Sequence, residues 1–387
     1  MIATAAEPCF DEESVLEDAR RATGLSDFGS DDFREGLRVL LRTYAEGPLT
    51  ERGRRSSRRR VVGLLATRLR VAEALRRHAE IARRELPHPM VLTGLPRSGT
   101  SALFNLLASD PSARALLLWE TQFPDPLEDA EPGAPDPRRV AIEAHYARSR
   151  KQNPEFTKIH FASADTPEEC VLLHAYAMTG VHLGTEVMIE PYASWYRDHD
   201  LHGMYAYYKT LLQMLDWQRP GERWLLKAPA HMWGIDALID TFPDVSIVWS
   251  HRNPLACTAS ICSMTHALMD GKIEFEKAAL GPVVMDFYAT SLERGLAARD
   301  RHDPAHFIDV THDEFVERPI GVAEKIYGHF GLPFEAPVRS ALKAHADANP
   351  KGRHGAHEYS LDDWGLTKER VRARFAPYAE RFGVETD

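Results

Sequence analysis

Hydrophobic positions along the chain follow two different patterns. Over residues 14–85, apolar side chains recur at helical spacing, as in Phe33, Leu37, Leu40 and Leu41, which predicts amphipathic helices. From residue 87 onward, short apolar runs alternate with segments of helical spacing. The change predicts an N-terminal helical extension over residues 1–86 and a second unit over residues 87–387.

The short apolar runs have strand character, and each is followed by a segment with the spacing of a helix. Strands that alternate with helices favour a central, mainly parallel sheet flanked by helices on both faces, with ligands at the carboxyl ends of the strands. We therefore predict a three-layer α/β fold. The predicted strands are residues 89–93, 223–227, 245–250 and 306–310, and the helices after them are 101–108, 232–241, 255–267 and 319–330.

Composition and charge narrow the function classes. The chain has 387 residues, of which 44% are hydrophobic and 27% charged, and its formal net charge is −10. These values are typical of a folded globular protein and exclude disorder, while the acidic total argues against nucleic acid as a partner. No apolar run is long enough to span a membrane, and acidic residues replace the features of a signal peptide. We expect a cytoplasmic protein without stable membrane insertion.

The most informative segment is residues 92–101, Leu-Thr-Gly-Leu-Pro-Arg-Ser-Gly-Thr-Ser. A glycine-containing turn between a strand and a helix aims backbone N–H groups at an anion. The segment is nearly a Walker A loop, but Thr100 stands where the lysine that binds ATP phosphates is expected. Arg97 instead offers a two-pronged guanidinium to an anionic group. The loop therefore indicates a nucleotide other than ATP.

A second segment places a cation at the end of another predicted strand. Arg252 follows the strand over residues 245–250, and Ser260 lies about two turns into the next helix. An arginine and a hydroxyl in this arrangement can hold a second, separate phosphate. The alternative is that Arg252 pairs with a nearby acidic residue.

Together the two segments resemble the sulfotransferases that use 3′-phosphoadenosine 5′-phosphosulfate (PAPS). In that family a Pro-Arg/Lys-Ser-Gly-Thr-Thr/Ser loop holds the 5′-phosphosulfate, and an arginine with a serine eight residues later holds the 3′-phosphate. The loop is similar to that of the bacterial-type branch and of the tyrosylprotein enzymes, and the resemblance covers about residues 88–383, with a P-loop-like fold. It implies donor contacts from Arg97, Ser98, Gly99, Thr100, Ser101, Arg252 and Ser260.

The resemblance also implies residues of the reaction centre. Glu120, in a Glu-Thr pair, matches the catalytic base of the tyrosylprotein enzymes, and Lys227 matches the lysine that neutralises the moving sulfuryl group. His231, four residues after this lysine, is the second candidate for the base, because cytosolic members carry a histidine two residues after theirs. A basic loop near the C-terminus matches the segment that closes over the 3′-phosphate and contributes Lys351, Gly352 and Arg353.

Several features have a structural reading. Residues 166–169, Thr-Pro-Glu-Glu, have the chemistry of a helix start with Thr166 as the cap. The arginine-rich residues 52–60 are interpreted as a solvated helix face, and the proline-rich residues 124–137 as a surface excursion or a lid. The candidate walls of an acceptor pocket are His160, Tyr192, Trp195 and Tyr196, of which the three aromatic residues could equally belong to the core.

These expectations describe an enzyme that moves a sulfuryl group from PAPS to a hydroxyl of a small-molecule or lipid-like acceptor by in-line displacement, without a metal. Two alternatives remain. An ATP-using kinase is disfavoured by Thr100, and a non-catalytic nucleotide-binding protein is disfavoured by Glu120 and Lys227. The acceptor and the oligomeric state stay open.

Overall fold

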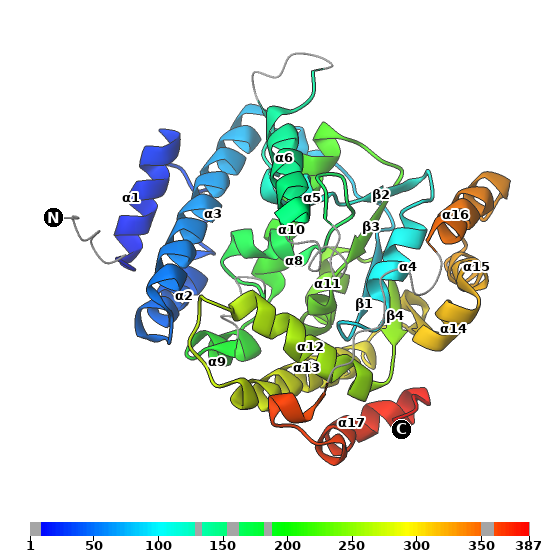
Figure 1. The fold of residues 1–387 in the computed structure, drawn as a ribbon. Helices are drawn as coiled ribbons and strands as arrows, with labels where there is room; N and C mark the ends of the chain where they lie inside the picture. Colours follow the sequence, from blue (N-terminus) through cyan, green and yellow to red (C-terminus); the bar gives the residue numbers. More distant parts are fainter. Residues whose placement is uncertain (1–8, 128–133, 153–161, 182–187, 350–359, 387) are drawn as a thin grey trace.

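The computed structural model describes residues 9–127, 134–152, 162–181, 188–349 and 360–386. Its centre is a five-stranded sheet in which every strand is parallel to its neighbours, in the order β2-β3-β1-β4-β5 (Figure 1). The predicted mainly parallel sheet is confirmed, with β2 as an additional short strand at one edge. The strands are β1 (Met90–Gly94), β2 (Ala113–Ala115), β3 (Arg223–Lys227), β4 (Ser246–His251) and β5 (Phe307–Thr311).

Alternate residues of the strands enter two separate hydrophobic cores, one on each face of the sheet. In β1, Met90 and Leu92 belong to one core and Val91 to the other. The first core is closed by α4 (Thr100–Leu107), α15 (Pro319–His329) and α16 (Ala336–Ala348). The second is closed mainly by α10 (His202–Gln218), α11 (Ile235–Thr241) and α13 (Lys277–Arg299). The three-layer α/β prediction is therefore confirmed.

The N-terminal region is helical, as its periodicity predicts. It forms α1 (Glu12–Thr23), α2 (Arg34–Glu46) and α3 (Glu51–Arg77), whose apolar side chains join the second core. The cation of Arg68 is buried, and it donates to the carbonyl of Tyr176 at 3.3 Å and to the carboxylate of Asp32 at 2.6 Å. The extension thus packs on the rest of the chain, and a division at residue 86 stays a prediction.

Part of the arginine run is not simply a solvated face. Arg54 donates to the carbonyl of Tyr44 at 3.1 Å, and Arg58 pairs with Asp18 at 2.6 Å. These contacts tie α3 to α2 and α1, because each guanidinium carries several donors that can satisfy groups on neighbouring helices.

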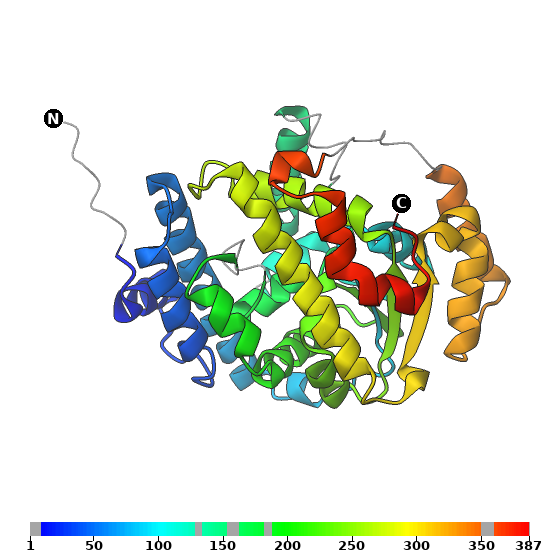
Figure 2. The same ribbon diagram turned by 90° about the horizontal axis from the view of Figure 1, so that it is seen from below.

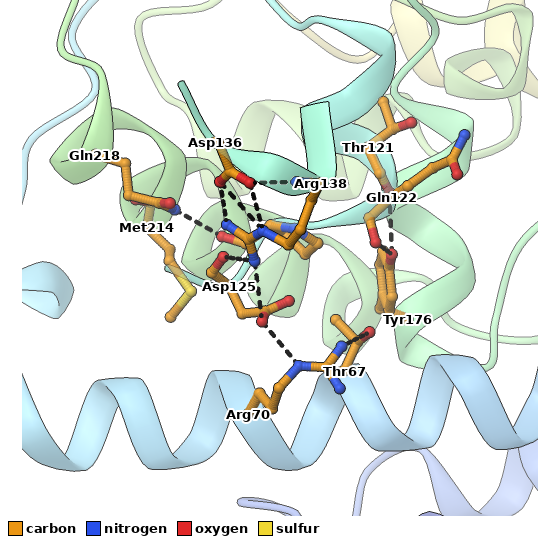
Figure 3. A network of polar contacts seen from close by, with 11 residues as sticks. Thr67, Arg70, Thr121, Gln122, Asp125, Asp136, Arg138, Tyr176, Met214 and Gln218 are labelled. Atoms are coloured by element: carbon orange, nitrogen blue, oxygen red, sulfur yellow. Dashed lines mark hydrogen bonds and ion pairs between the residues drawn. The ribbon is translucent and has the colours of Figure 1, made fainter. Parts of the chain in front are cut away.

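The described part of the proline-rich excursion is pinned between α3 and α6 (Pro137–Gln152). Asp125 is buried, and it accepts from Arg70 at 2.8 Å and from Arg138 through both its backbone and its side chain (Figure 3). Gln218 of α10 donates to the carbonyl of Pro124 at 2.8 Å. A buried carboxylate requires such partners, and here they fix the segment that leads into α6.

The predicted helix start at Thr166 is wrong. Pro167 instead forms an antiparallel bridge with Leu117, where the backbone N–H of Leu118 donates to Thr166 at 2.9 Å and that of Glu168 donates to Leu116 at 2.8 Å. The helix begins only at α8 (Val171–His174). Backbone groups that find partners on a neighbouring segment do not need a helix cap, so the tertiary contact overrides the local signal.

The remaining elements surround this framework. In Figure 2, which views the molecule from below, α17 lies beside α13, and α17 contacts both α12 and α13. None of the helices in the described part of the chain is long and apolar enough to cross a membrane. The remaining elements around the framework are α5 (Leu118–Gln122), α9 (Tyr192–Asp198), α12 (Pro254–Met269), α14 (His312–Glu317), α17 (Lys368–Phe382) and the short helices η1 (Ile81–Arg83), η2 (Ala175–Ala177), η4 (Pro229–Trp233), η5 (Pro304–His306) and η6 (Asp362–Trp364).

Candidate active site

The order of the strands brings the predicted site residues to one edge of the sheet. Because β1 lies between β3 and β4, the loop after β1 is flanked by the carboxyl ends of both neighbours. Lys227 is the last residue of β3, and Arg252 directly follows β4. Such an edge is where ligands bind in open α/β sheets.

Backbone geometry explains the composition of the loop after β1. Gly94 and Gly99 have φ angles of +134° and +93°, and a Cβ at Gly94 would lie 2.3 Å from the carbonyl oxygen of Ser250. Only glycine lets β1 and β4 approach this closely. Arg97 also has a positive φ, +69°, which is rare for a residue with a side chain and is typical of functional sites.

The loop leads into a helix end suited to an anion. Gly99 is the N-cap of α4 and provides no side-chain cap, so the N–H groups of the first turn lack intrahelical partners. The helix dipole adds positive potential at the same place. The hydroxyl of Ser98 is buried and has no hydrogen-bond partner among the described residues. These groups fit the phosphosulfate end of PAPS.

The two predicted nucleotide motifs meet in space. Arg97 Nε donates to Ser260 Oγ at 3.1 Å across 163 residues of sequence, and Arg252 Nη1 donates to the carbonyl oxygen of Arg97 at 2.7 Å. The resemblance assigned Arg97 to the phosphosulfate and Ser260 to the 3′-phosphate. The guanidinium of Arg97 therefore reaches toward the second motif, and the three residues form one cationic group with a hydroxyl.

Lys227 joins this loop to a carboxylate that the sequence analysis did not assign. Its buried ammonium nitrogen lies 3.2 Å from Ser101 Oγ and 2.6 Å from Glu169 Oε1. Its backbone carbonyl accepts from Cys170 N at 3.0 Å. The pairing of residues 166–168 with residues 116–118 is what directs Glu169 to this point. The two consecutive acidic residues after Pro167 are the only sequence signal for this carboxylate, and the prediction of a helix start gave them a structural role instead.

Glu120 has different surroundings. It is 1% exposed, and both of its carboxylate oxygens accept from Arg114 at 2.9 Å. Arg219 Nε and the backbone N–H of Leu117 each donate to it at 2.9 Å. Among the described residues, no hydrogen bond or ion pair joins Glu120 to the loop, Lys227 or Arg252. Its geometry is that of a carboxylate held in a buried ion-pair cluster.

His231 also lies inside the core. Its Nδ1 is 2.7 Å from the hydroxyl of Tyr205, and its Nε2 has no partner in the described part of the chain. Burial lowers the pKa of His231 to about 3, so the ring is neutral at pH 7. The ring of His174 lies 5.4 Å away. Among the described residues, no hydrogen bond joins His231 to the loop after β1.

The remaining candidate residues are those proposed as walls of an acceptor pocket and those of the basic C-terminal loop. Tyr192 and Tyr196 are buried in the second core, while Trp195 is partly buried and donates to Glu35 at 2.8 Å. Within the described ranges, no group of three or more His, Cys, Asp or Glu residues could hold a metal ion. His160, Lys351, Gly352 and Arg353 lie outside the described residues.

Known proteins with matching sequences are sulfotransferases. A model of the "Sulfotransferase family" matches residues 89–336. The omega-hydroxy-beta-dihydromenaquinone-9 sulfotransferase Stf3 of Mycobacterium bovis and of Mycobacterium tuberculosis is 24% identical over 170 residues, which are 42% of this chain and 41% of the relative. The chain therefore matches about two fifths of the length of these curated relatives.

Solved structures match over nearly the whole chain. Sulfotransferase STF1 from Mycobacterium tuberculosis is 32% identical, with a TM-score of 0.84 and coverage of 96% of this chain and 100% of that one. Sulfotransferase STF9 from Mycobacterium avium is 28% identical, with a TM-score of 0.89 and coverage of 99% of both chains. Together with the family match and the glycine loop at the edge of the parallel sheet, these similarities show that the chain belongs to the sulfotransferase family.

Proposed function

We propose that this protein transfers a sulfuryl group from PAPS to a hydroxyl group of a lipid-like or other small acceptor. The observation that carries the proposal is the contact between the two nucleotide motifs, in which Arg97, Arg252 and Ser260 converge beside the start of α4. PAPS carries negative charge at its 5′-phosphosulfate and at its 3′-phosphate. The site supplies backbone N–H groups for the first and guanidinium groups for the second.

The residues of the loop and of β3 would neutralise charge during the transfer. The N–H groups at the start of α4 and the ammonium of Lys227 lie around Ser101. Fixed donors of this kind stabilise charge that develops in a transition state, and sulfuryl transfer resembles phosphoryl transfer in depending mainly on positioning and charge. In the same proposal, Lys351, Gly352 and Arg353 close over the 3′-phosphate.

The base is assigned to Glu169, with Glu120 and His231 as alternatives. The carboxylate of Glu169 is 29% exposed and lies beside Lys227, whereas Glu120 is enclosed by two arginines. In the proposed step Glu169 accepts the proton of the acceptor hydroxyl. The hydroxyl oxygen forms a bond to sulfur while the bond from sulfur to the 5′-phosphate oxygen breaks, which releases adenosine 3′,5′-bisphosphate.

A hydroxylated lipid is the acceptor class that we favour. The support is that a relative of 24% identity is a sulfotransferase for omega-hydroxy-beta-dihydromenaquinone-9. The identity of the acceptor would be obtained by incubating the protein with PAPS and hydroxylated lipids and detecting the mass added by sulfation.

Calorimetry tests which nucleotide the protein binds. We expect adenosine 3′,5′-bisphosphate to bind without Mg²⁺ and Mg·ATP not to bind. Arg252→Ala should weaken binding of the bisphosphate at least about tenfold, because a charge-assisted hydrogen bond is lost. The matched control is Arg339→Ala, which should leave binding unchanged because Arg339 lies on α16 and pairs with Glu324 of α15 at the surface. Binding of Mg·ATP in preference to the bisphosphate would contradict the proposal and favour a kinase.

A further inference from the structure

The C-terminal helix α17 contacts the nucleotide edge although it lies beyond residues 89–336, which match the family model. In Figure 2, α17 lies beside α13. The side chain of Tyr378 is 4% exposed. Its hydroxyl oxygen lies 3.3 Å from the backbone N–H of Arg252 and 3.3 Å from His251 Nδ1. One hydroxyl of α17 therefore contacts two consecutive residues at the end of β4.

His251 is itself held in one orientation. Its Nε2 lies 2.8 Å from Asp309 Oδ1 of β5, and its ring stacks on Phe382 of α17 with a centroid distance of 3.9 Å. Asp309 is also bound by both terminal nitrogens of Arg299, at 2.6 Å and 2.7 Å. The imidazole is thus clamped between β5 and α17.

The chemistry of these groups gives the hydrogen bonds a direction. Burial lowers the pKa of His251, so the ring is neutral and carries one N–H. An ionised carboxylate accepts only, so this N–H is on Nε2 and Nδ1 is an acceptor. The hydroxyl of Tyr378 then donates to Nδ1, and its oxygen accepts the N–H of Arg252. Every member of the chain from Asp309 to Arg252 has a partner.

We propose that Tyr378 and His251 are positioning residues that fix the backbone of Arg252, so that α17 sets the affinity for the 3′-phosphate of the donor. The inference rests on the proposed function, because it assigns Arg252 to that phosphate. Arg252 also donates to the carbonyl of Arg97. A shift of its backbone would move the contact between the two nucleotide motifs.

Removal of one hydroxyl tests the inference. We expect Tyr378→Phe to weaken binding of adenosine 3′,5′-bisphosphate about five- to tenfold in calorimetry, since a neutral hydrogen bond is worth roughly this factor. The KM for PAPS should rise in proportion, while kcat at saturating donor and the KM for the acceptor stay unchanged. The control is Tyr327→Phe, which removes another buried hydroxyl that donates to Asp110 at 2.5 Å in the other core.

A second variant keeps the result decisive if Tyr378→Phe does not fold. His251→Phe preserves the stacking on Phe382 and removes both ring nitrogens, and it should weaken bisphosphate binding to a similar degree. The double variant should bind about as weakly as either single variant, because residues in one hydrogen-bond network are not additive. Unchanged affinity in either variant, or fully additive losses, would overturn the inference. Absence of bisphosphate binding by the unaltered protein would instead contradict the proposed function.

Discussion

Glu120 and Glu169 illustrate how neighbours decide what a carboxylate can do. Glu120 receives hydrogen bonds from Arg114, Arg219 and a backbone N–H in a site that is almost closed to solvent. Glu169 contacts the ammonium of Lys227 and remains partly exposed. A base must reach the proton of a substrate, which is why we propose Glu169 rather than Glu120 for this role.

We predict that replacing each of these two glutamates by glutamine affects a different property, catalysis in one case and stability in the other. Glu169→Gln should lower kcat about 100- to 10,000-fold, the usual contribution of a general base, and leave the affinity for adenosine 3′,5′-bisphosphate nearly unchanged. Glu120→Gln should instead lower the free energy of unfolding by about 3 kcal/mol, because it breaks a buried ion pair. Steady-state kinetics and urea unfolding measure the two effects. If Glu120→Gln abolishes kcat while stability is kept, Glu120 is the base.

Among the elements, α6 is a helix of 16 residues without a buried residue. Polar contacts hold it instead. Arg138 binds Asp125, Glu143 accepts from the backbone N–H of Ala164 at 2.9 Å, and Arg139 pairs with Asp165. Residues 164 and 165 lead directly to the segment that carries Glu169. The position of this carboxylate therefore depends on α6 and, through Asp125, on α3.

We predict that Arg70→Ala disturbs the position of Glu169 more than it disturbs nucleotide binding. The change removes one of the two arginines that bind the buried carboxylate of Asp125 (Figure 3), and should lower the free energy of unfolding by about 1–2 kcal/mol. The KM for the acceptor should rise several-fold, while bisphosphate affinity is kept. Arg76→Ala is the control on the same helix, because Arg76 pairs with Glu73 at the surface. Equal effects of both variants would contradict the prediction.

At the scale of the whole molecule, the net charge of −10 coexists with a local cationic site. Arg97, Lys227 and Arg252 come from three different positions in the sequence and meet because β3, β1 and β4 are neighbours in the sheet. The acidic balance is thus a property of the remaining surface. It does not describe the edge where an anionic donor would bind.

We predict that two buried histidines make the free energy of unfolding depend on pH. Burial lowers the pKa of His231 to about 3, and burial together with His231 lowers the pKa of His174. Because an unfolded histidine titrates near pH 6.5, the unfolded chain binds protons below this pH that the folded chain does not. Stability should be complete above about pH 6.5 and fall toward pH 3, with a slope of about 1.4 kcal/mol per pH unit for each histidine.

Urea unfolding at pH 7, 6 and 5 measures this slope. His174→Phe, which keeps an aromatic ring between Tyr205 and Tyr208, should reduce the slope by about half. His145→Phe, at an exposed position of α6, should leave the slope unchanged. An identical slope in all three proteins would mean that the buried histidines are not its source.

The sequence by itself determined most of the elements and the two motifs that we propose bind the donor. Periodicity predicted a helical region over residues 14–85, four of the five strands and a helix after each of these strands, and the motifs pointed to Arg97 and Arg252 as candidates. These features depend on neighbours in sequence, so local chemistry is enough to predict them. The short strand β2 was missed because three residues carry too weak a pattern.

Tertiary structure decided which groups face one another. The pairing of residues 166–168 with residues 116–118 replaced the predicted helix start and directed Glu169 to Lys227. The order of the strands placed Arg97 against Ser260, and the packing of α17 placed Tyr378 against Arg252. Each of these contacts joins residues far apart in the chain. Their geometry depends on which partners the buried backbone groups and charged groups find on other elements. Local sequence patterns cannot predict these partners.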